Sequence, residues 1–279
     1  MKLCTYQSPK GPRVGVVEDG RVFDAGFDGP MTDLIRDWPN ARAALEKAVS
    51  QSDGLRLEDV QLLAPVLRPG KIFAIGLNYA DHIAESKLGT PEHQVWFTKA
   101  VTSINGPYSP VQIPKISHFV DYEAELVAVI GKGGRHVPAE RAAEHIFGYC
   151  VGNDVTERLW QHRTPQWSLG KSFDTHAPIG PWITTADAVT DVHNLDLRCS
   201  VNGELRQSSN TRHLVFNVFQ QVEHLSQAMT LEPGDLIFTG TPGGIGAAMD
   251  PRQFLKEGDV VRCEISGLGY IENRFQKEA

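Results

Sequence analysis

Residues 120–131 constrain the fold of this chain more than any other segment, because they place two carboxylates in an otherwise apolar strand. Side chains alternate between the two faces of a strand, so Glu123 and Glu125 point to the same side, about 7 Å apart. Downstream of them both faces are apolar, which indicates a buried strand. Two carboxylates buried on one face repel each other and lose hydration, which costs several kcal/mol per ion unless a cation compensates.

A third acidic residue follows a second apolar strand. Residues 146–151 are an apolar run, and a glycine and an asparagine separate them from Asp154. An acid beside a permissive glycine at a strand end can reach the carboxylates of a neighbouring strand. Three such acids suit a hard divalent cation such as Mg²⁺, which takes oxygen ligands and keeps positions open for water or substrate. The alternative is a strand end in solvent, where Glu123 and Glu125 are ordinary surface acids.

The rest of the chain predicts a mainly β structure of the α+β class. Apart from an N-terminal stripe at 32–49, which Pro39 interrupts, helical patterns are clear only at residues 139–146 and 214–228. Strands and helices do not alternate regularly, which argues against a doubly wound sheet or a (β/α)₈ barrel. We expect a small N-terminal α/β domain at 1–66, a proline-rich linker, and a β-rich catalytic domain at 70–279.

Composition narrows the class of protein. The 279 residues are 41% hydrophobic and 22% charged, which is typical of a globular chain. A net charge of −7 argues against a general nucleic-acid binder. No apolar run approaches the ~20 residues of a membrane span. Four widely spaced cysteines without a C-x-x-C pair argue against a zinc ribbon or a disulfide framework. We therefore expect a soluble cytoplasmic protein that binds neither nucleic acid nor membranes.

Several motifs together resemble the fumarylacetoacetate hydrolase superfamily. They are the E-x-E strand, an Asp 29 residues after the second Glu, G-K-S-F-D-T-x-x-P-I-G-P from Gly170, and L-E-P-G-D-L-I-F-T-G-T-P-x-G-I-G from Leu231. The likeness covers residues 71–271. It implies a mixed β-sandwich roll of that superfamily's C-terminal type, usually a homodimer. It also implies binding of Mg²⁺ or Mn²⁺ through Glu123, Glu125 and Asp154.

Residues 76–85 offer a catalytic base. If they are helical, His82 and Glu85 share a face, and the carboxylate can orient the imidazole and raise its basicity. The alternative is an incidental pair on a surface helix, because charge pairs at this spacing are common. Similar N-Y-x-x-H-x-x-E segments of acylpyruvate hydrolases lie on a lid that closes over the metal. The resemblance therefore implies a catalytic His82–Glu85 pair on a lid at 78–90.

Lys171 follows a glycine in an uncharged segment, where its ammonium could lie near a developing oxyanion or simply extend along the surface into solvent. The resemblance implies a catalytic role for Lys171 and a substrate contact for Thr175, four residues later. Arg158 and Gln161 share a helical face with Asp154, and they resemble substrate contacts of the family. Alternatively, Arg158 forms an ordinary i,i+4 ion pair with Asp154.

The glycine-rich segment 239–246 could suggest a nucleotide site. It lacks the Lys-Ser/Thr of a P-loop and the third small residue of the dinucleotide fingerprint, so nucleotide binding is disfavoured. A loop that presents backbone N–H groups and the Thr241 hydroxyl to an anion fits better, and the resemblance implies that Thr241 meets substrate. His176 could line the pocket, but a position in a solvent-facing loop is expected.

These residues and the resemblance predict a metal-dependent hydrolase that cleaves a C–C bond of an acylpyruvate-type 2,4-dioxo acid, such as fumarylpyruvate, maleylpyruvate or acetylpyruvate. Water activated by His82 and Glu85 would attack the distal carbonyl while the cation and Lys171 face developing negative charge. A decarboxylase, isomerase or dehydratase of a small oxo acid on the same metal site is the first alternative. The second is a non-catalytic binding protein that keeps the fold.

Overall fold

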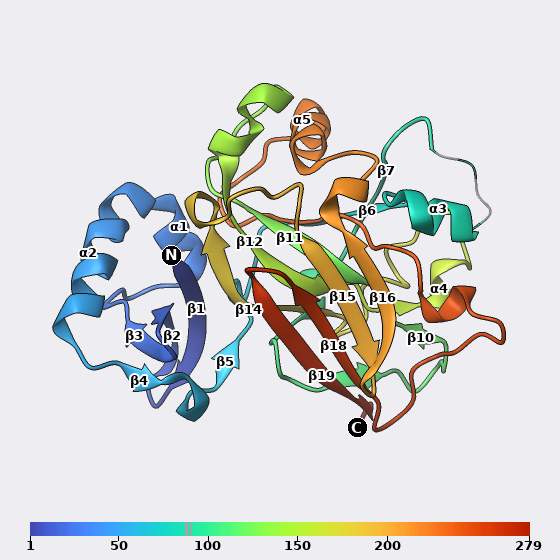
Figure 1. Cartoon of the computed structure of the whole chain (residues 1–279), viewed down its shortest axis with the longest axis horizontal. Helices are drawn as coiled ribbons and strands as arrows, with labels where there is room; N and C mark the ends of the chain where they lie inside the picture. The colour runs from blue at the N-terminus through green and yellow to red at the C-terminus, as the bar shows by residue number, and fades with distance from the viewer. Residues whose placement is uncertain (87–88, 90) are drawn as a thin grey trace.

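A computed structural model describes residues 1–86, 89 and 91–279, which form sheets of 12, five and two strands (Figure 1). The longest path through the large sheet runs β4-β3-β2-β1-β14-β12-β11-β17-β6-β7, with β5 beside β1 and β8 beside β14. These strands are β1 (Lys2–Ser8), β2 (Gly11–Glu18), β3 (Arg21–Asp24), β4 (Leu55–Arg56), β5 (Leu62–Leu63), β6 (Ile72–Gly76), β7 (Val95–Thr98), β8 (Ile104–Asn105), β11 (Ala124–Ile130), β12 (Ile146–Asn153), β14 (Ala177–Thr185) and β17 (Leu236–Phe238).

The five-stranded sheet packs across the large one and closes the sandwich. Its order is β16-β15-β18-β19-β9, formed by β16 (Glu204–Asn210), β15 (Asp196–Val201), β18 (Val260–Ile265), β19 (Gly269–Lys277) and β9 (Val111–Ile113). One apolar cluster joins the two sheets and includes Leu126 and Val151 from one, and Leu197 and Ile271 from the other. The mainly β, mixed-sandwich fold with a few helices, predicted from the sequence, is confirmed.

Strand β11 is the centre of this arrangement. All seven of its residues are buried, with β12 and β17 as its two neighbours in the sheet. Leu126 and Ala128 face the five-stranded sheet, whereas Val127 and Val129 belong to a second apolar cluster on the other side. The predicted strand is interrupted, because β10 (Val120–Asp121) pairs separately with β13 (Thr156–Glu157).

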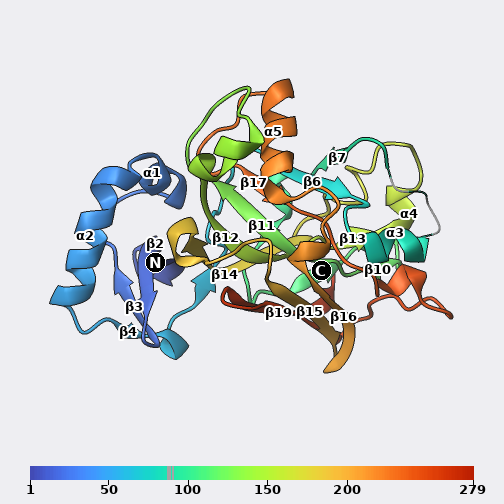
Figure 2. The same ribbon diagram turned by 45° about the horizontal axis from the view of Figure 1, so that its top comes forward.

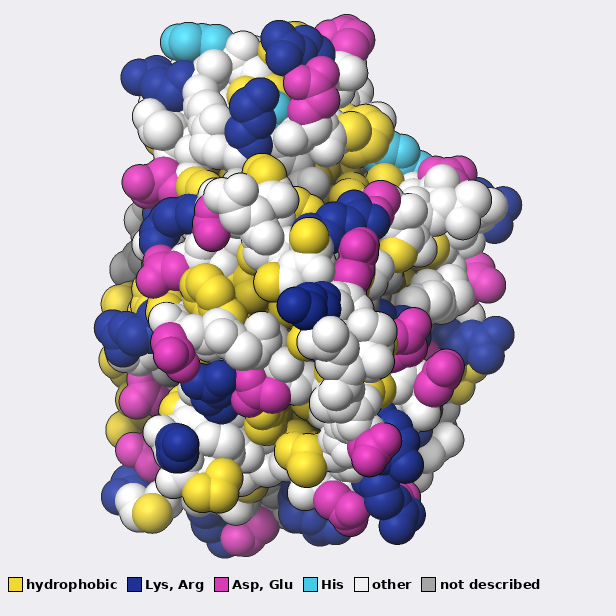
Figure 3. Space-filling model, turned by 90° about the vertical axis from the view of Figure 1, so that its left-hand side faces the viewer, with side chains coloured by type: hydrophobic (Ala, Val, Ile, Leu, Met, Phe, Trp, Pro, Cys, Tyr) yellow, Lys and Arg dark blue, Asp and Glu magenta, His cyan; other side chains and the backbone are white. Residues whose placement is uncertain are grey.

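The N-terminal unit is joined to the rest through the large sheet. β1 pairs with β14, and the second apolar cluster contains Leu3 and Leu34 together with Val127 and Ile183. A continuous sheet and a shared core therefore extend across the predicted boundary near residues 66–70. The division of the chain into two separate domains stays a prediction. On the side of the molecule where this unit lies, Lys/Arg and Asp/Glu side chains are scattered among hydrophobic and other side chains (Figure 3).

The helices differ in part from the predicted ones. Pro39 divides the first helical stripe as expected, into α1 (Met31–Arg36) and α2 (Trp38–Gln51). The helix predicted at 214–228 begins later, as α5 (Val218–Ala228), because Asn217 caps it in a capping box with Gln220. The segment predicted at 139–146 is a 3₁₀ helix, η3 (Ala139–His145). The other 3₁₀ turns are η1 (Leu57–Asp59), η2 (Val101–Ser103), η4 (Ala186–Ala188), η5 (Thr211–His213) and η6 (Gly246–Ala248).

Two short helices and η6 gather on the side of the molecule away from the N-terminal unit (Figures 1 and 2). They are α3 (Ala80–Ser86) and α4 (Arg158–Gln161). The expected helix around His82 is therefore present, although residues 87, 88 and 90 of the predicted lid lie outside the described residues. Within the described part of the chain, no helix has the length and apolar character needed to cross a membrane.

Candidate metal centre and active site

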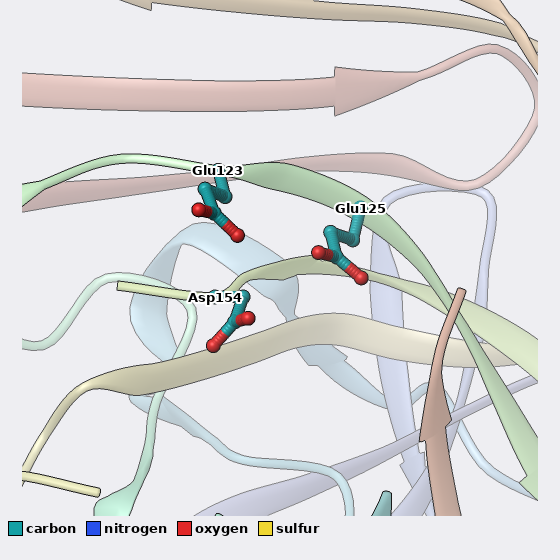
Figure 4. A group of neighbouring side chains, drawn as sticks. All are labelled: Glu123, Glu125 and Asp154. Atoms are coloured by element: carbon teal, nitrogen blue, oxygen red, sulfur yellow. The ribbon is translucent and has the colours of Figure 1, made fainter. Parts of the chain in front are cut away.

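Glu123, Glu125 and Asp154 converge where β11 and β12 lie side by side (Figure 4). In the antiparallel register Glu125 lies opposite Gly152, and the backbone N–H of Asp154 donates to the carbonyl of Glu123 at 2.8 Å. One carboxylate oxygen from each residue lies within 4.8 Å of the others, and all three side chains are buried. The alternative of ordinary surface acids is therefore wrong.

Three buried cations lie among the acids. The Lys171 ammonium is 2.7 Å from both Glu123 Oε2 and Asp154 Oδ2. The Arg158 guanidinium lies 2.7 Å from Glu123 Oε1 and 2.8 Å from Asp121 Oδ2. The alternative of a simple Asp154–Arg158 ion pair is therefore wrong. Removing either partner of such a buried pair would leave an uncompensated charge in a low-dielectric interior.

Lys99, to which the sequence analysis gave no role, is the third of these cations. Its ammonium lies 2.6 Å from Asp154 Oδ1 and also donates to the carbonyl oxygens of Val155 and Lys171. Burial lowers the pKa of Lys99, and its approach to Asp154 opposes that shift. Lys99 thus fixes one carboxylate oxygen of Asp154, while Lys171 holds the other.

Glu125 differs from its neighbours because no cation pairs with it among the described residues. Its Oε2 accepts a hydrogen bond from the backbone N–H of Gly240 at 2.7 Å. Burial, and then the negative charges of Asp154 and Glu123, raise the pKa of Glu125 well above its usual value.

The contrast with Glu123 shows what a cation does at this site. Burial alone would raise the pKa of Glu123, but Lys171 and Arg158 outweigh that effect and lower it to about 2. Counting Asp121, four carboxyl groups face three cations, so the cluster would carry one excess negative charge, at Glu125, if all four were ionised. The donor set is therefore all oxygen and under-compensated, which fits a hard divalent cation.

His82 and Glu85 lie on the predicted face of α3. His82 Nδ1 is 3.6 Å from Glu85 Oε2, slightly beyond hydrogen-bond distance, and both residues line the same cavity as Glu123. Catalytic hydrogen bonds are often longer in ligand-free structures and shorten when substrate binds. The backbone N–H of Gly244 donates to both oxygens of Glu85, at 3.0 and 3.1 Å, so the glycine-rich segment holds this carboxylate beside the imidazole.

The cavity has a volume of about 490 Å³ and contains most of the predicted site residues. It is bounded by α3, α4 and the segment after β17, and its wall includes His82, Glu85, Glu123, Arg158, Gln161, Lys171 and Thr241. Gln161 accepts a hydrogen bond from Arg158 at 3.0 Å, and the Thr241 hydroxyl donates to the Ala124 carbonyl at 2.9 Å. Apolar side chains such as Trp167 and Phe254 complete the wall.

Two residues of the segment after Lys171 lie elsewhere than expected. The structure does not bring Thr175 to the cavity wall, because its hydroxyl accepts a hydrogen bond from the backbone N–H of Gln112 at 2.8 Å. His176, expected in a solvent-facing loop, is fully buried, with its Nε2 at 2.9 Å from the Gln112 carbonyl. Both side chains therefore fasten this segment to β9.

The glycine-rich segment binds the protein's own acids. The N–H of Gly240 donates to Glu125, that of Gly244 to Glu85, and that of Gly246 to Asp121. These three groups are thus already engaged, contrary to the expectation that the loop presents its N–H groups to an external anion. Glycine is required at position 244, where a Cβ atom would lie 2.0 Å from the Arg206 carbonyl oxygen.

Asp121 was also missed, although the sequence held a signal for it. It lies two residues before Glu123, and the same alternation that pairs the two glutamates extends to it. Its Oδ2 accepts from Arg158 at 2.8 and 2.9 Å and from the N–H of Ala247 at 2.9 Å. Asp121 therefore fastens both α4 and η6 beside the acid cluster.

Known proteins resemble the chain over nearly its whole length. The family model described as fumarylacetoacetate (FAA) hydrolase C-terminal matches residues 71–276. A mitochondrial oxaloacetate tautomerase of Xenopus laevis is 42% identical over 98% of this chain and 89% of that protein.

Solved structures agree with these sequence relatives. Maleylpyruvate hydrolase from Sphingobium sp. SYK-6, in complex with manganese(II) and pyruvate, has a TM-score of 0.86 and 34% identity, with 100% of both chains covered. A 5-carboxymethyl-2-hydroxymuconate delta-isomerase from Mycobacterium smegmatis has a TM-score of 0.81 and 37% identity, also over 100% of both chains.

The unequal pairing of the two glutamates predicts unequal effects of matched substitutions. Without divalent ions, Glu123→Gln should lower the free energy of unfolding by about 3–5 kcal/mol, because Lys171 and Arg158 each lose one of their two carboxylate partners. Glu125→Gln should change it by no more than about 1 kcal/mol, since the carboxyl group that it replaces has no cation partner among the described residues. Urea titrations in EDTA measure both values. Equal destabilisation by the two variants would contradict the charge assignment.

Proposed function

The chain belongs to the fumarylacetoacetate hydrolase family, and from this premise we propose that it is a metal-dependent enzyme acting on the enol chemistry of a small 2-oxo acid. The observation that carries the proposal is a cluster of three buried carboxylates, one of which, Glu123, lines the same cavity as the His82–Glu85 pair. The carboxylates suit a divalent cation, and the imidazole provides a group that can accept and return a proton.

Glu123, Glu125 and Asp154 would hold Mg²⁺ or Mn²⁺. Glu125 supports this fit most directly, since its buried carboxylate has no cation partner among the described residues. A divalent ion bound there supplies a Lewis acid that polarises the 2-oxo group of a substrate. The manganese in the maleylpyruvate hydrolase of Sphingobium sp. SYK-6 supports the same choice of ion class.

The remaining roles follow from the side chains of this chain. His82 faces the cavity and transfers the proton at C3 of the substrate, with Glu85 as the residue that orients its ring. Gln161 presents its amide N–H to the carboxylate and oxo oxygens, while Arg158 and Lys171, which are bonded to the acids, supply positive charge beside them. The apolar part of the wall, including Trp167, excludes water and so strengthens these polar contacts.

Keto–enol tautomerisation of an oxaloacetate-like acid is the first candidate reaction. A proton leaves C3 and a proton is added to the oxygen at C2, so no water or further reactant is consumed. The 42% identity to the Xenopus laevis oxaloacetate tautomerase, over 98% of this chain, favours this reaction. It belongs to the isomerase alternative that the sequence left open.

Hydrolysis of an acylpyruvate, the reaction that the sequence favoured, is the second candidate. The likeness to maleylpyruvate hydrolase supports it, at 34% identity and a TM-score of 0.86. The His82–Glu85 pair could also activate water for attack on a distal carbonyl. Decarboxylation would share the same enolate, but no relative named above is a decarboxylase.

A direct assay separates these reactions. The Mg²⁺-loaded protein should accelerate the interconversion of enol and keto oxaloacetate, followed by the loss of enol absorbance, and EDTA should abolish the effect. Acetylpyruvate should be turned over slowly or not at all. Rapid hydrolysis of acetylpyruvate without tautomerisation would favour the second candidate, and turnover of neither substrate would favour a binding protein.

His82→Ala tests the proton-transfer role. We expect tautomerisation to fall by about 10²–10⁴-fold, the usual contribution of a positioned acid–base group. The affinity for Mn²⁺, measured by calorimetry, should be nearly unchanged because His82 is not part of the carboxylate cluster. His118→Ala, at an exposed histidine outside the cavity wall, is the matched control. Undiminished turnover in His82→Ala would remove the proposed role.

We further propose a homodimer, on the family relationship alone, and a cytoplasmic location, on the composition and hydropathy of the sequence alone. Light scattering of the purified protein should give twice the 30.8 kDa mass of one chain, and a monomer at all concentrations would contradict it.

A further inference from the structure

The wall of the cavity between η6 and Phe254 is a short segment held firmly to the acid cluster. The N–H of Gly246 donates to Asp121 at 2.8 Å, and the N–H of Gln253 donates to the Gly246 carbonyl at 2.9 Å. The Phe254 ring packs edge-on against Phe119, with ring centroids 5.1 Å apart. The backbone at Arg252 is therefore fixed relative to Asp121. It is also fixed relative to Glu123, which lies two residues after Asp121 in the chain.

Arg252 is the cation in this wall whose donors are free. Arg158 and Lys171 also line the cavity, but they are bonded to Asp121, Glu123 and Asp154. Arg252 is exposed and forms no ion pair or hydrogen bond with any residue in the described ranges 1–86, 89 and 91–279. A fixed backbone and an unpaired guanidinium together make a site for an anionic group that comes from outside the chain.

The positive charges around the cavity also favour an anion site at Arg252. His162 lines the same wall, and its pKa is lowered by burial and then by the positive charges of Arg158, Lys171 and Arg252. The positive charges therefore act together on one region of the cavity wall. The wall residues that flank Arg252 in the sequence, Met249 and Phe254, are apolar.

We propose that Arg252 is a specificity-determining residue that binds a second carboxylate at the end of the substrate remote from the 2-oxo acid group. The substrate class is thus a small 2-oxo dicarboxylic acid. This inference rests on the proposed function, which places the 1-carboxylate and 2-oxo group at the acid cluster. The planar guanidinium can donate two parallel hydrogen bonds to a carboxylate, whereas a methyl or aryl group would leave it in water.

The size of the cavity is consistent with this class. A volume of about 490 Å³ lies in the lower part of the roughly 300–1,000 Å³ range of small-molecule sites. The wall of this one cavity includes Glu123 and Lys171 at the acid cluster as well as Arg252, so it offers a group for each end of a dicarboxylic acid. The same recognition serves tautomerisation and hydrolysis, because both leave the distal carboxylate unchanged.

The test compares two chemically stable ligands that differ in one group. 2-Oxoglutarate and 2-oxopentanoate have the same chain, with a terminal carboxylate in the first and a methyl group in the second. Calorimetry on the Mn²⁺-loaded protein should show about tenfold tighter binding of 2-oxoglutarate, the size of one charge-assisted hydrogen bond. Arg252→Met should reduce this ratio to within about twofold, and Arg252→Lys should retain part of it.

Arg163→Met is the matched control, because Arg163 is an exposed arginine that stacks over Trp160 at 4.1 Å and is not part of the cavity wall. It should keep the tenfold ratio. A ratio near one in the unaltered protein, or a ratio that survives in Arg252→Met, would overturn the inference while leaving the proposed function intact. Failure of the Mn²⁺-loaded protein to bind pyruvate or either oxo acid would instead overturn the proposed function, and this inference with it.

Discussion

The carboxyl groups buried beside β11 outnumber the cations that pair with them, and the rest of this structure depends on this constraint. Strands β11 and β12 lie in the interior of a sandwich, where an unpaired carboxylate is costly. Lys99, Lys171 and Arg158 come from three separate parts of the chain and offset most of that charge. In the part of the chain that the structure describes, Glu125 remains without a cation partner, so the fold itself creates a site that a divalent ion would satisfy.

The same acids also shape the cavity above them. Glu125 accepts a hydrogen bond from the Gly240 N–H, and Glu85 accepts one from the Gly244 N–H. Asp121 accepts hydrogen bonds from the Gly246 N–H and from the Arg158 guanidinium. The contacts of Glu125 and Asp121 tie a loop or short helix to a strand, and that of Glu85 ties the loop to α3. Each is a charged hydrogen bond, which is stronger than a neutral one. Charge and shape are thus set by one network, and a substitution in it would change both ion binding and the position of the cavity wall.

Sequence reasoning located the centre of the site but not its surroundings. Alternation along one strand was enough to place Glu123 and Glu125 together, and helical spacing was enough for His82 and Glu85. The partners of these acids depend on contacts between distant segments, such as Lys99 with Asp154, which no local period encodes. Thr175 shows the converse, since its motif resembled a substrate contact but its hydroxyl is bonded to Gln112.

The central claim is that Glu123, Glu125 and Asp154 together bind one divalent ion. Anomalous diffraction from a crystal grown with Mn²⁺ tests it most directly. We expect a single manganese peak within coordination distance of one oxygen from each carboxylate, at roughly 2.0–2.3 Å. A crystal with Mn²⁺ bound elsewhere, or with the Lys171 ammonium still lying between Glu123 and Asp154 at saturating Mn²⁺, would contradict the account.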